Sequence, residues 1–323
     1  MKNKYVFVAI MLSCILLISG IFTGVYVNQS QSADTDDDFV VVTSFYPMYI
    51  AALNVVKDVP GVTLQNLSEP QTGCLHDFQL TPQDMKLLST ADVFIVNGGG
   101  IESFMEQIAA AYPELVIIEA SEGIELLCED HEHEEEHKHE EEHIDETEEE
   151  HDHGVNAHAW MSVSCYRRQV ENIARNLMKA NPANAVEYER NAAEYDGKLT
   201  KLQEKQQEIT ELLRDQSAIM FHCAFDYVAE DYGINVAYCM DLDEERQVSA
   251  GEVAKVLSVI ETEAVSYIFA EELYGKAMCE TIQKEADVTV IYLDPLNRGE
   301  YETDSYIDAM SRNIQLLKDA FSE

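Results

Sequence analysis

The sequence predicts an α/β protein with two lobes, each built on a parallel-type sheet, and one long helix that joins them. Short apolar, β-branched runs alternate with helical segments both before and after residues 181–214. This alternation is typical of parallel sheets that are covered on both faces. The polar segment between the two regions carries leucine and isoleucine at helical spacing, and its roughly 30 residues suit a rigid helix of about 45 Å.

The first half begins with an expected strand at 39–44 and a helix that ends near residue 56. Further strands are expected at 62–67, 92–97 and 115–119, with helices starting at residue 82 and spanning 101–112. Thr81 suits the N-cap of the helix at 82, because Pro82 fits its first position and Asp84 its third. The glycines at 98–100 lack the spacing of a phosphate-binding loop and are expected to let the backbone turn.

The second half repeats the pattern. Residues 156–160 are expected to lead into a helix that ends near Lys179, and Asn181 and Pro182 to cap and open the long helix. Ser249 is expected to cap a helix through 261, with Glu252 completing a capping box. The remaining strands are expected at 217–221, 235–238, 267–270 and 288–293, and the remaining helices after residue 222, at 275–286 and at 306–321.

The N-terminus carries an export signal. Two lysines in the first four residues precede an uncharged apolar run at 5–27, which is long enough to span a bilayer. An uncleaved anchor, a lipid on Cys14, or a signal peptide cleaved near residues 32–33 would each explain it. The mature chain is therefore expected outside the cytoplasm, tethered to the outer face of the membrane, or secreted or periplasmic.

The predicted domain organisation follows from these segments. It comprises a signal or anchor at 1–33, an N-terminal lobe at 38–180 that contains an acidic, histidine-rich loop at 129–153, a linking helix at 181–214 and a C-terminal lobe at 215–323.

The formal charge of −40 excludes one class of partner and favours another. Such a chain should avoid nucleic acid and anionic lipid and should attract cations. Seven cysteines are present, but their spacing matches no zinc knuckle or redox pair, and any disulfide pairing stays open. We expect a monomer whose ligand is a divalent metal ion.

The loop at 129–153 has almost nothing apolar with which to offset the entropy of ordering it. Its imidazoles and carboxylates can hold divalent metal loosely. The alternative interpretation is a solvated tail without a binding role. Seven of the ten histidines lie in it: His131, His133, His137, His139, His143, His151 and His153.

Four residues outside that loop form the candidate metal site: His76, His158, His222 and Asp294. Each follows an expected strand or precedes an expected helix, two in each half, so they could meet in the cleft between the lobes. Three neutral imidazoles and one carboxylate satisfy Zn²⁺ tetrahedrally and leave no open position for catalysis. Taken singly, a histidine at a strand end is commonly a hydrogen-bonding residue, and Asp-Pro is commonly a turn.

Several short motifs resemble those of one known family, the solute-binding proteins of zinc and manganese ABC importers (lipoprotein and adhesin-like). They occur in the same order as in that family and cover the chain from about residue 40 to 320. The matching segments are Thr43-Ser44-Phe45-Tyr46-Pro47, His76-Asp77-Phe78-Gln79-Leu80-Thr81-Pro82, Asn97-Gly98-Gly99-Gly100-Ile101-Glu102, Asn156-Ala157-His158-Ala159-Trp160, Phe221-His222-Cys223-Ala224-Phe225 and Tyr292-Leu293-Asp294-Pro295-Leu296.

The resemblance implies a C-clamp of two lobes around a rigid helix, with metal delivered to an ABC permease in the membrane. It implies His76, His158, His222 and Asp294 as ligands. Within that family an imidazole at the third ligand and a histidine-rich loop accompany zinc, whereas a glutamate there accompanies manganese. His222 therefore favours Zn²⁺, and Mn²⁺ or another divalent ion is the alternative.

The sequence departs from the family at two cysteines. Cys74 precedes the first ligand, and Cys223 replaces the usual aspartate beside His222. Because neighbouring side chains in extended backbone point to opposite sides, we expect Cys223 to point away from the metal.

Two other function classes remain open. A zinc hydrolase would use Glu271 or Glu272 as general base, but HExxH is absent. A surface adhesin or metal buffer would use the loop at 129–153 alone. The prediction is a metal-binding transport protein and not an enzyme.

Overall fold

The structure is a computed structural model that describes residues 38–69, 78–128, 154–240, 242 and 248–322. The chain divides into two compact units, Met1–Phe39 and Val40–Glu323. Almost all of the first unit, including the apolar run at 5–27, lies outside the described residues. Within the described part of the chain, none of the helices combines the length and the apolar character that crossing a bilayer requires.

The first sheet confirms the predicted parallel arrangement. Its strand order is β2-β1-β3-β4, and β3 pairs in parallel with both β1 and β4. The strands β1 and β3 are the buried centre of the sheet, as their apolar, β-branched sequences predict. The elements are β1 (Phe39–Thr43), α2 (Tyr46–Val56), β2 (Val62–Asn66), α3 (Pro82–Leu88), β3 (Val93–Val96), α4 (Met105–Ala111) and β4 (Val116–Glu119).

The second sheet has the order β10-β9-β7-β8, and each neighbouring pair is parallel. Its core packs between the sheet and helices α8 and α9, around Ile219, Ile268 and Ile282. The elements are β7 (Ser217–Met220), η3 (Cys223–Phe225), α7 (Asp226–Tyr232), β8 (Asn235–Cys239), α8 (Ala250–Glu263), β9 (Tyr267–Ala270), α9 (Glu272–Glu285) and β10 (Thr289–Tyr292). The predicted α/β class with two parallel sheets is therefore confirmed.

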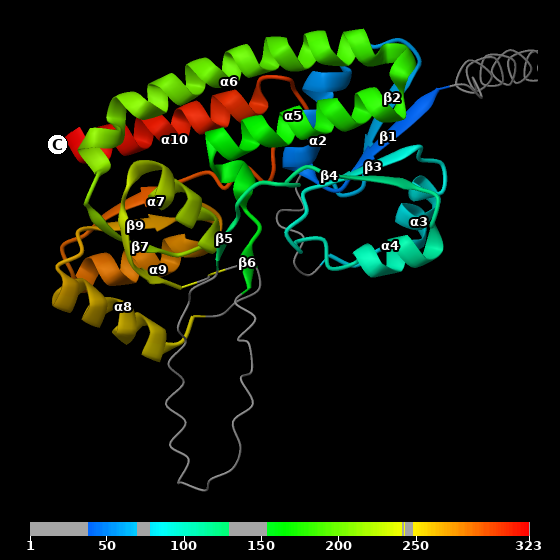
Figure 1. Ribbon diagram of the computed structural model, residues 1–323. Coiled ribbons are helices and arrows are strands. Elements are labelled where there is room, and N and C mark those ends of the chain that lie inside the picture. The colour runs from blue at the N-terminus through cyan, green and yellow to red at the C-terminus, as the bar shows by residue number, and fades with distance from the viewer. Residues whose placement is uncertain (1–37, 70–77, 129–153, 241, 243–247, 323) are drawn as a thin grey trace, which may run out of the picture. The chain divides into compact units, whose positions relative to one another are not determined.

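A layer of long helices lies over both sheets (Figure 1). Helix α6 (Ala185–Leu213, 29 residues) packs along α5 (Val163–Ala180), α10 (Ser305–Ser322) and α2. The sequence showed a polar segment with leucine and isoleucine at helical spacing, yet this helix buries a continuous face that includes further residues. Two tyrosines, which a leucine pattern does not reveal, belong to it. The buried residues are Tyr188, Tyr195, Leu199, Leu202, Gln206, Ile209 and Leu213.

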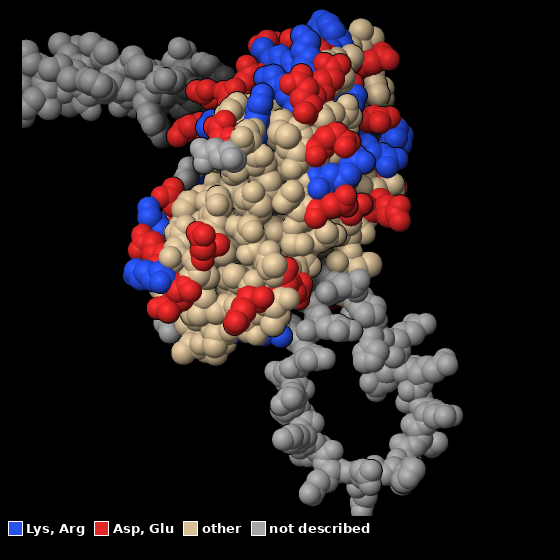
Figure 2. Space-filling view, turned by 90° about the vertical axis from the view of Figure 1, so that its left-hand side faces the viewer, with Lys and Arg blue, Asp and Glu red and all other residues tan. Residues whose placement is uncertain are grey.

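The face of this helical layer that points away from the sheets is polar. In Figure 2, side chains of both signs gather over the upper part of the unit, where α6 and α10 lie, and the middle of the same face carries few charges. One of the ion pairs of the helical layer joins Arg167 on α5 to Asp196 on α6, with Nε and Oδ1 at 2.7 Å. The solvent-facing side of these helices thus carries charges of both signs.

Two of the predicted capping signals are confirmed, whereas Asn181 precedes a 3₁₀ turn and is not the cap of α6. Thr81 and Asp84 form a reciprocal capping box at the start of α3, and Ser249 and Glu252 form another at the start of α8. These signals need only the neighbouring three residues, so the sequence alone specifies them.

Several predicted helix starts are wrong by a few residues. Helix α4 begins at Met105 instead of Ile101, and α9 begins at Glu272 instead of Gly275. The segment after Asn156 first forms a short 3₁₀ turn, η1 (Ala159–Met161), and Ser162 then caps α5. A second 3₁₀ turn, η2 (Pro182–Asn184), precedes α6. Before α5 and α6 a short 3₁₀ turn was read as regular helix, and such turns are common at helix ends.

A small hairpin was not predicted. Strands β5 (Leu127–Cys128) and β6 (Val155–Asn156) pair antiparallel, with Cys128 opposite Val155. This pairing holds together the two ends of the loop at 129–153, whose own residues lie outside the described ones. Each strand has two residues, too few for a recognisable pattern. The lobe boundaries proposed above stay a prediction.

Candidate metal centre

The structure describes three of the four predicted ligands: His158, His222 and Asp294. His76 and the seven histidines of the loop at 129–153 lie outside the described residues. The roles of all of these residues stay predictions. Among the described residues, one group of potential ligand atoms converges, and it consists of His158, His222 and Cys223.

His158 lies at the start of η1, and its side chain is fully buried. Its Nδ1 is 2.9 Å from Oδ1 of Asn156. Because an amide oxygen can only accept, Nδ1 is the donor and Nε2 keeps its lone pair. Metal-binding histidines commonly show this arrangement, in which an oxygen fixes the tautomer and the ring orientation. His158 is therefore set to offer Nε2.

His222 follows strand β7 in extended conformation and caps η3, where its Nδ1 accepts a 3.0 Å hydrogen bond from the backbone N–H of Ala224. Its ring centroid is 5.0 Å from that of His158. In the neutral imidazole this cap leaves the proton on Nε2. Binding of metal by His222 therefore requires either that Nδ1 gives up the hydrogen bond from Ala224 or that the ring turns.

Cys223 does not point away, so the expected orientation was wrong. Its Sγ lies 3.6 Å from Nδ1 of His158, and the residue is 4% exposed. The alternation rule applies to a continuing strand, but the chain leaves the strand at His222 and turns into η3 at Cys223. That turn brings two successive side chains to one side.

Asp294 follows β10 and is not a member of the converging group. Its Oδ1 accepts from the backbone N–H of Leu296 at 2.8 Å, and Oδ2 lies 3.8 Å from Arg312. The next residue, Pro295, accepts a 2.9 Å hydrogen bond from the indole of Trp160. The turn that carries Asp294 is thus anchored to the segment that carries His158.

Asn156 is a site residue whose role the sequence did not indicate. It is fully buried, and its Nδ2 donates to the carbonyl of Cys223 at 2.8 Å. The same side chain accepts from Nδ1 of His158 through Oδ1. One amide therefore connects the segments that carry both histidines. The Asn-Ala-His spacing could have suggested this, since asparagine commonly bonds two residues ahead.

A second supporting network reaches His158 through its neighbour Ala157. Nδ2 of Asn97 donates to the carbonyl of Ala157 at 2.9 Å. Gly99 (φ +67°) packs so closely that an added Cβ would lie 3.2 Å from that of Ala157. Only glycine combines this φ with this approach.

Glu102 holds the other side of the same network. It accepts from the backbone N–H of Asn97 at 2.7 Å and from Ser44 at 2.8 Å. Burial raises the pKa of its carboxyl to about 7, against the opposing effect of these hydrogen bonds and one from Gly98.

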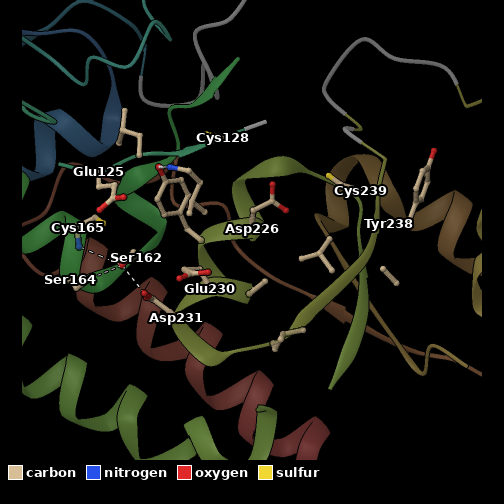
Figure 3. A pocket seen from close by; sticks show the side chains of 17 residues that line it. Glu125, Cys128, Ser162, Ser164, Cys165, Asp226, Glu230, Asp231, Tyr238 and Cys239 are labelled. Carbon is tan, nitrogen blue, oxygen red and sulfur yellow. Dashed lines mark hydrogen bonds between the residues drawn. The ribbon is translucent and has the colours of Figure 1, made fainter. Parts of the chain in front are cut away.

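A cavity of about 1080 Å³ lies beside this site, between β5, α5, α7 and β8 (Figure 3). Asp226 and Asp231 line it, and the Ser162 hydroxyl donates to Asp231 at 2.9 Å. Burial raises the pKa of the Cys165 thiol, which therefore stays protonated. Among the described residues, no three potential ligand atoms converge in this cavity. The His158–His222–Cys223 group is the better metal centre.

Comparison with known proteins shows the family to which the chain belongs. The sequence profile of the family described as "Zinc-uptake complex component A periplasmic" matches residues 41–320. The "High-affinity zinc uptake system protein ZnuA" of Bacillus subtilis (strain 168) is 30% identical over 327 residues, which cover 99% of this chain and 98% of that protein. The "Zinc-binding lipoprotein AdcA" of Streptococcus pneumoniae is 27% identical over 309 residues, and the chain spans 60% of its length.

Solved structures show the same fold. The crystal structure of Zn(II)-bound AdcA from S. pneumoniae has a TM-score of 0.71 at 25% identity, covering 88% of this chain and 58% of that one. The structure of the solute-binding protein FpvC from Pseudomonas aeruginosa with Ni²⁺ has a TM-score of 0.72 at 25% identity, covering 88% and 98%. Two lobes with parallel sheets and a long helix are common to this chain and these proteins.

Proposed function

Because the chain belongs to the family of periplasmic A components of zinc-uptake complexes, we propose that it binds Zn²⁺ tightly outside the cytoplasm and delivers it to an ABC-type permease. The observation that carries this proposal is the convergence of His158 and His222, which come from different lobes, with Cys223 beside them. A site shared by two lobes couples metal binding to the arrangement of the lobes, and a permease can recognise that arrangement.

The donor atoms favour Zn²⁺. Imidazole nitrogen and thiolate sulfur suit Zn²⁺, whereas Mn²⁺ prefers oxygen donors. We propose His76, His158, His222 and Asp294 as the ligands that complete the site. Asp294 supplies one negative charge, and its turn is anchored through Trp160 and Pro295. Zinc is the cargo here and not a resident cofactor.

Another divalent ion is the second candidate for the same role. FpvC, which has the same fold, has been crystallised with Ni²⁺ and with Mn²⁺. The shared fold by itself therefore does not select the metal, and the donor set must do so. Mn²⁺ is the less suitable of these ions for a site with two imidazoles and a neighbouring thiol.

The hydrolase alternative loses support because Glu271 and Glu272, its two candidate general bases, are each paired with a basic residue. Oε1 of Glu271 lies 3.3 Å from Nη2 of Arg298, and Oε1 of Glu272 lies 2.7 Å from Nζ of Lys276. The family is one of transport components. We propose that the chain is not an enzyme.

We propose the loop at 129–153 as a low-affinity collector of metal. Its ends are held by the β5–β6 hairpin, and Asn156 in that hairpin is hydrogen-bonded to His158. Metal released by the loop would thus reach the central site over a short path. The loop would raise the local metal concentration without forming the tight site, and the surface-buffer hypothesis would instead place all binding in it.

We propose a tethered or periplasmic monomer. The N-terminal residues, with their basic start and apolar run, agree with export. S. pneumoniae AdcA is named a lipoprotein. Cys14 is the candidate for lipid attachment in this chain.

Competition between Zn²⁺ and Mn²⁺ tests the proposal. The chain should bind one Zn²⁺ far more tightly than Mn²⁺, and thermal unfolding should show a large zinc-dependent stabilisation, about 4 kcal/mol at 1,000 times the Kd. Both effects should be lost in His222→Ala and in His158→Ala. Zinc-loaded protein should stimulate ATP hydrolysis by the importer, and His222→Ala should not. Retention of the tight site in both variants would refute the proposal.

A further inference from the structure

The thiol of Cys223 shares the buried space in which the two histidines meet. One nitrogen of His158, one nitrogen of His222 and Sγ of Cys223 all lie within 4.8 Å of one another. All three residues are buried, at 0%, 5% and 4% exposure. The sulfur is therefore as enclosed as the imidazoles and lies among their possible ligand atoms.

Two hydrogen bonds hold the backbone of Cys223 in place. The carbonyl of Cys223 accepts from Nδ2 of Asn156 at 2.8 Å and from the backbone N–H of Asp226, which closes η3. The first of these bonds comes from the residue that also orients His158. The position of Cys223 relative to His158 is thus fixed by one shared side chain.

The geometry is close to that of a zinc shell. With Zn–S of about 2.3 Å and Zn–N of about 2.0 Å, ligand atoms in a tetrahedron lie about 3.5 Å apart. Sγ lies 3.6 Å from Nδ1 of His158, the nitrogen that Asn156 orients, so the side chains must turn to bring Sγ and Nε2 to that separation. Rotation about χ1 of Cys223 and χ2 of the histidines can supply such movements without moving the backbone.

We propose that Sγ of Cys223 is a ligand of the transported metal, beside His158 and His222. This inference rests on the proposed function, because it concerns the same site: Sγ of Cys223 takes one of the four ligand positions, for which Asp294, outside the converging group, is the alternative. The thiol proton is released to solvent as the metal–sulfur bond forms. A thiolate donor favours Zn²⁺ over Mn²⁺ more strongly than imidazole alone does. Cys223 is then a determinant of metal selectivity.

Co²⁺ is the probe for this bond, because a cobalt–thiolate bond gives a near-ultraviolet charge-transfer band that imidazole and carboxylate ligands do not give. The full chain in detergent micelles, kept reduced, should show this band with one equivalent of Co²⁺. The band should disappear in Cys223→Ser, and Zn²⁺ affinity should fall at least tenfold. The preference for Zn²⁺ over Mn²⁺ should fall with it.

Two controls separate the effect of Cys223 from that of two other thiols, Cys239 and Cys128. Cys239→Ser replaces a thiol of similar burial at the end of β8 and should keep the band. Cys128→Ser removes the exposed thiol that adjoins the loop at 129–153, and it should also keep the band. If Cys128→Ser loses the band and Cys223→Ser keeps it, the proposal is overturned.

A measurement on the unmodified protein covers the case in which Cys223→Ser does not fold. X-ray absorption at the zinc edge, with one equivalent of Zn²⁺, should require one sulfur at about 2.3 Å. A first shell of nitrogen and oxygen only, with tight binding intact, would overturn the role of Cys223 and leave the proposed function standing. Absence of tight Zn²⁺ and Co²⁺ binding would overturn both.

Discussion

Asn156 and Cys223 are joined by a hydrogen bond of 2.8 Å from the side-chain amide of Asn156 to the carbonyl of Cys223. The two residues are 67 positions apart, one in the β5–β6 hairpin and one in the 3₁₀ turn η3 that follows β7. Through Oδ1 the same amide orients His158. The metal centre is therefore organised by a residue that is not a ligand.

Replacing Asn156 should weaken metal binding more than it weakens the fold. Asn156→Ala removes the acceptor that fixes the tautomer of His158, and loss of such partners typically costs 10- to 100-fold in metal affinity. Calorimetric titration with Zn²⁺ measures this affinity. Asn172→Ala is the matched control, because Asn172 is also buried and bonds two backbone carbonyls, those of Ala120 and Glu122. Equal affinity losses in both variants would contradict the assigned role.

The single tryptophan should report on the site directly. The ring of Trp160 lies 5.0 Å from that of His158, and the chain has no other tryptophan. Binding of Zn²⁺ to His158 places a positive charge beside the indole, so Trp160 emission should change and saturate at one equivalent. His222→Ala should shift the response to higher zinc concentration. Metal bound only to the loop at 129–153 would leave the emission unchanged.

The proposed ligand Asp294 can be tested without breaking its turn. Asn can still accept from the N–H of Leu296, so Asp294→Asn should keep the unfolding temperature and remove the charge. Zn²⁺ affinity should drop by at least tenfold if the carboxylate ligates. Asp304→Asn, which loses an exposed ion pair with Lys198, is the control and should bind normally. Normal binding by Asp294→Asn would remove this residue from the ligand set.

Deleting the loop should distinguish the tight metal site from the weak ones. Cys128 and Val155 face each other in the hairpin, so Asn-Gly in place of residues 129–154 suits a tight connecting turn. The shortened chain should keep one tight Zn²⁺ and lose the weak ones. With an ordinary histidine pKa of about 6.5, the weak sites of the intact chain should fail on acidification before the tight one. Identical pH midpoints for the intact and shortened chains would contradict this.

Glu102 should make stability depend on pH. Its pKa is about 7 in the folded protein, against 4.5 ordinarily, so the folded state holds the proton more tightly than the unfolded chain. The resulting stabilisation is fully present below about pH 4.5 and is lost as the pH rises to about 7, a change of about 3 kcal/mol.

The matching variant is Glu102→Gln, which stays neutral at every pH. The difference in unfolding free energy between the protein and this variant, measured with chelator by denaturant titration, should shift in favour of the variant between pH 5 and 7.5. Glu204→Gln, at an exposed position on α6, should show no such shift. A difference that is constant across this range would mean that Glu102 does not titrate there.

Features that depend on a few neighbouring residues were predictable. The strands at the centre of each sheet follow from short β-branched runs, and the capping boxes at Thr81 and Ser249 follow from spacings of three residues. Where a 3₁₀ turn precedes a helix, as before Val163, the sequence pattern of the turn is the same as that of the helix. The predicted start of the helix was therefore misplaced.

What the sequence by itself determined is the alternation of strands and helices, the capped helix starts and the set of residues able to bind metal. These are properties of local backbone preference and side-chain chemistry. Only the tertiary structure decided that Cys223 faces His158, that Asn156 links both, and that Glu102 is buried with a raised pKa. Each of these depends on partners brought together by the packing of distant segments, and a hydrogen bond or a desolvated charge has no counterpart in sequence spacing.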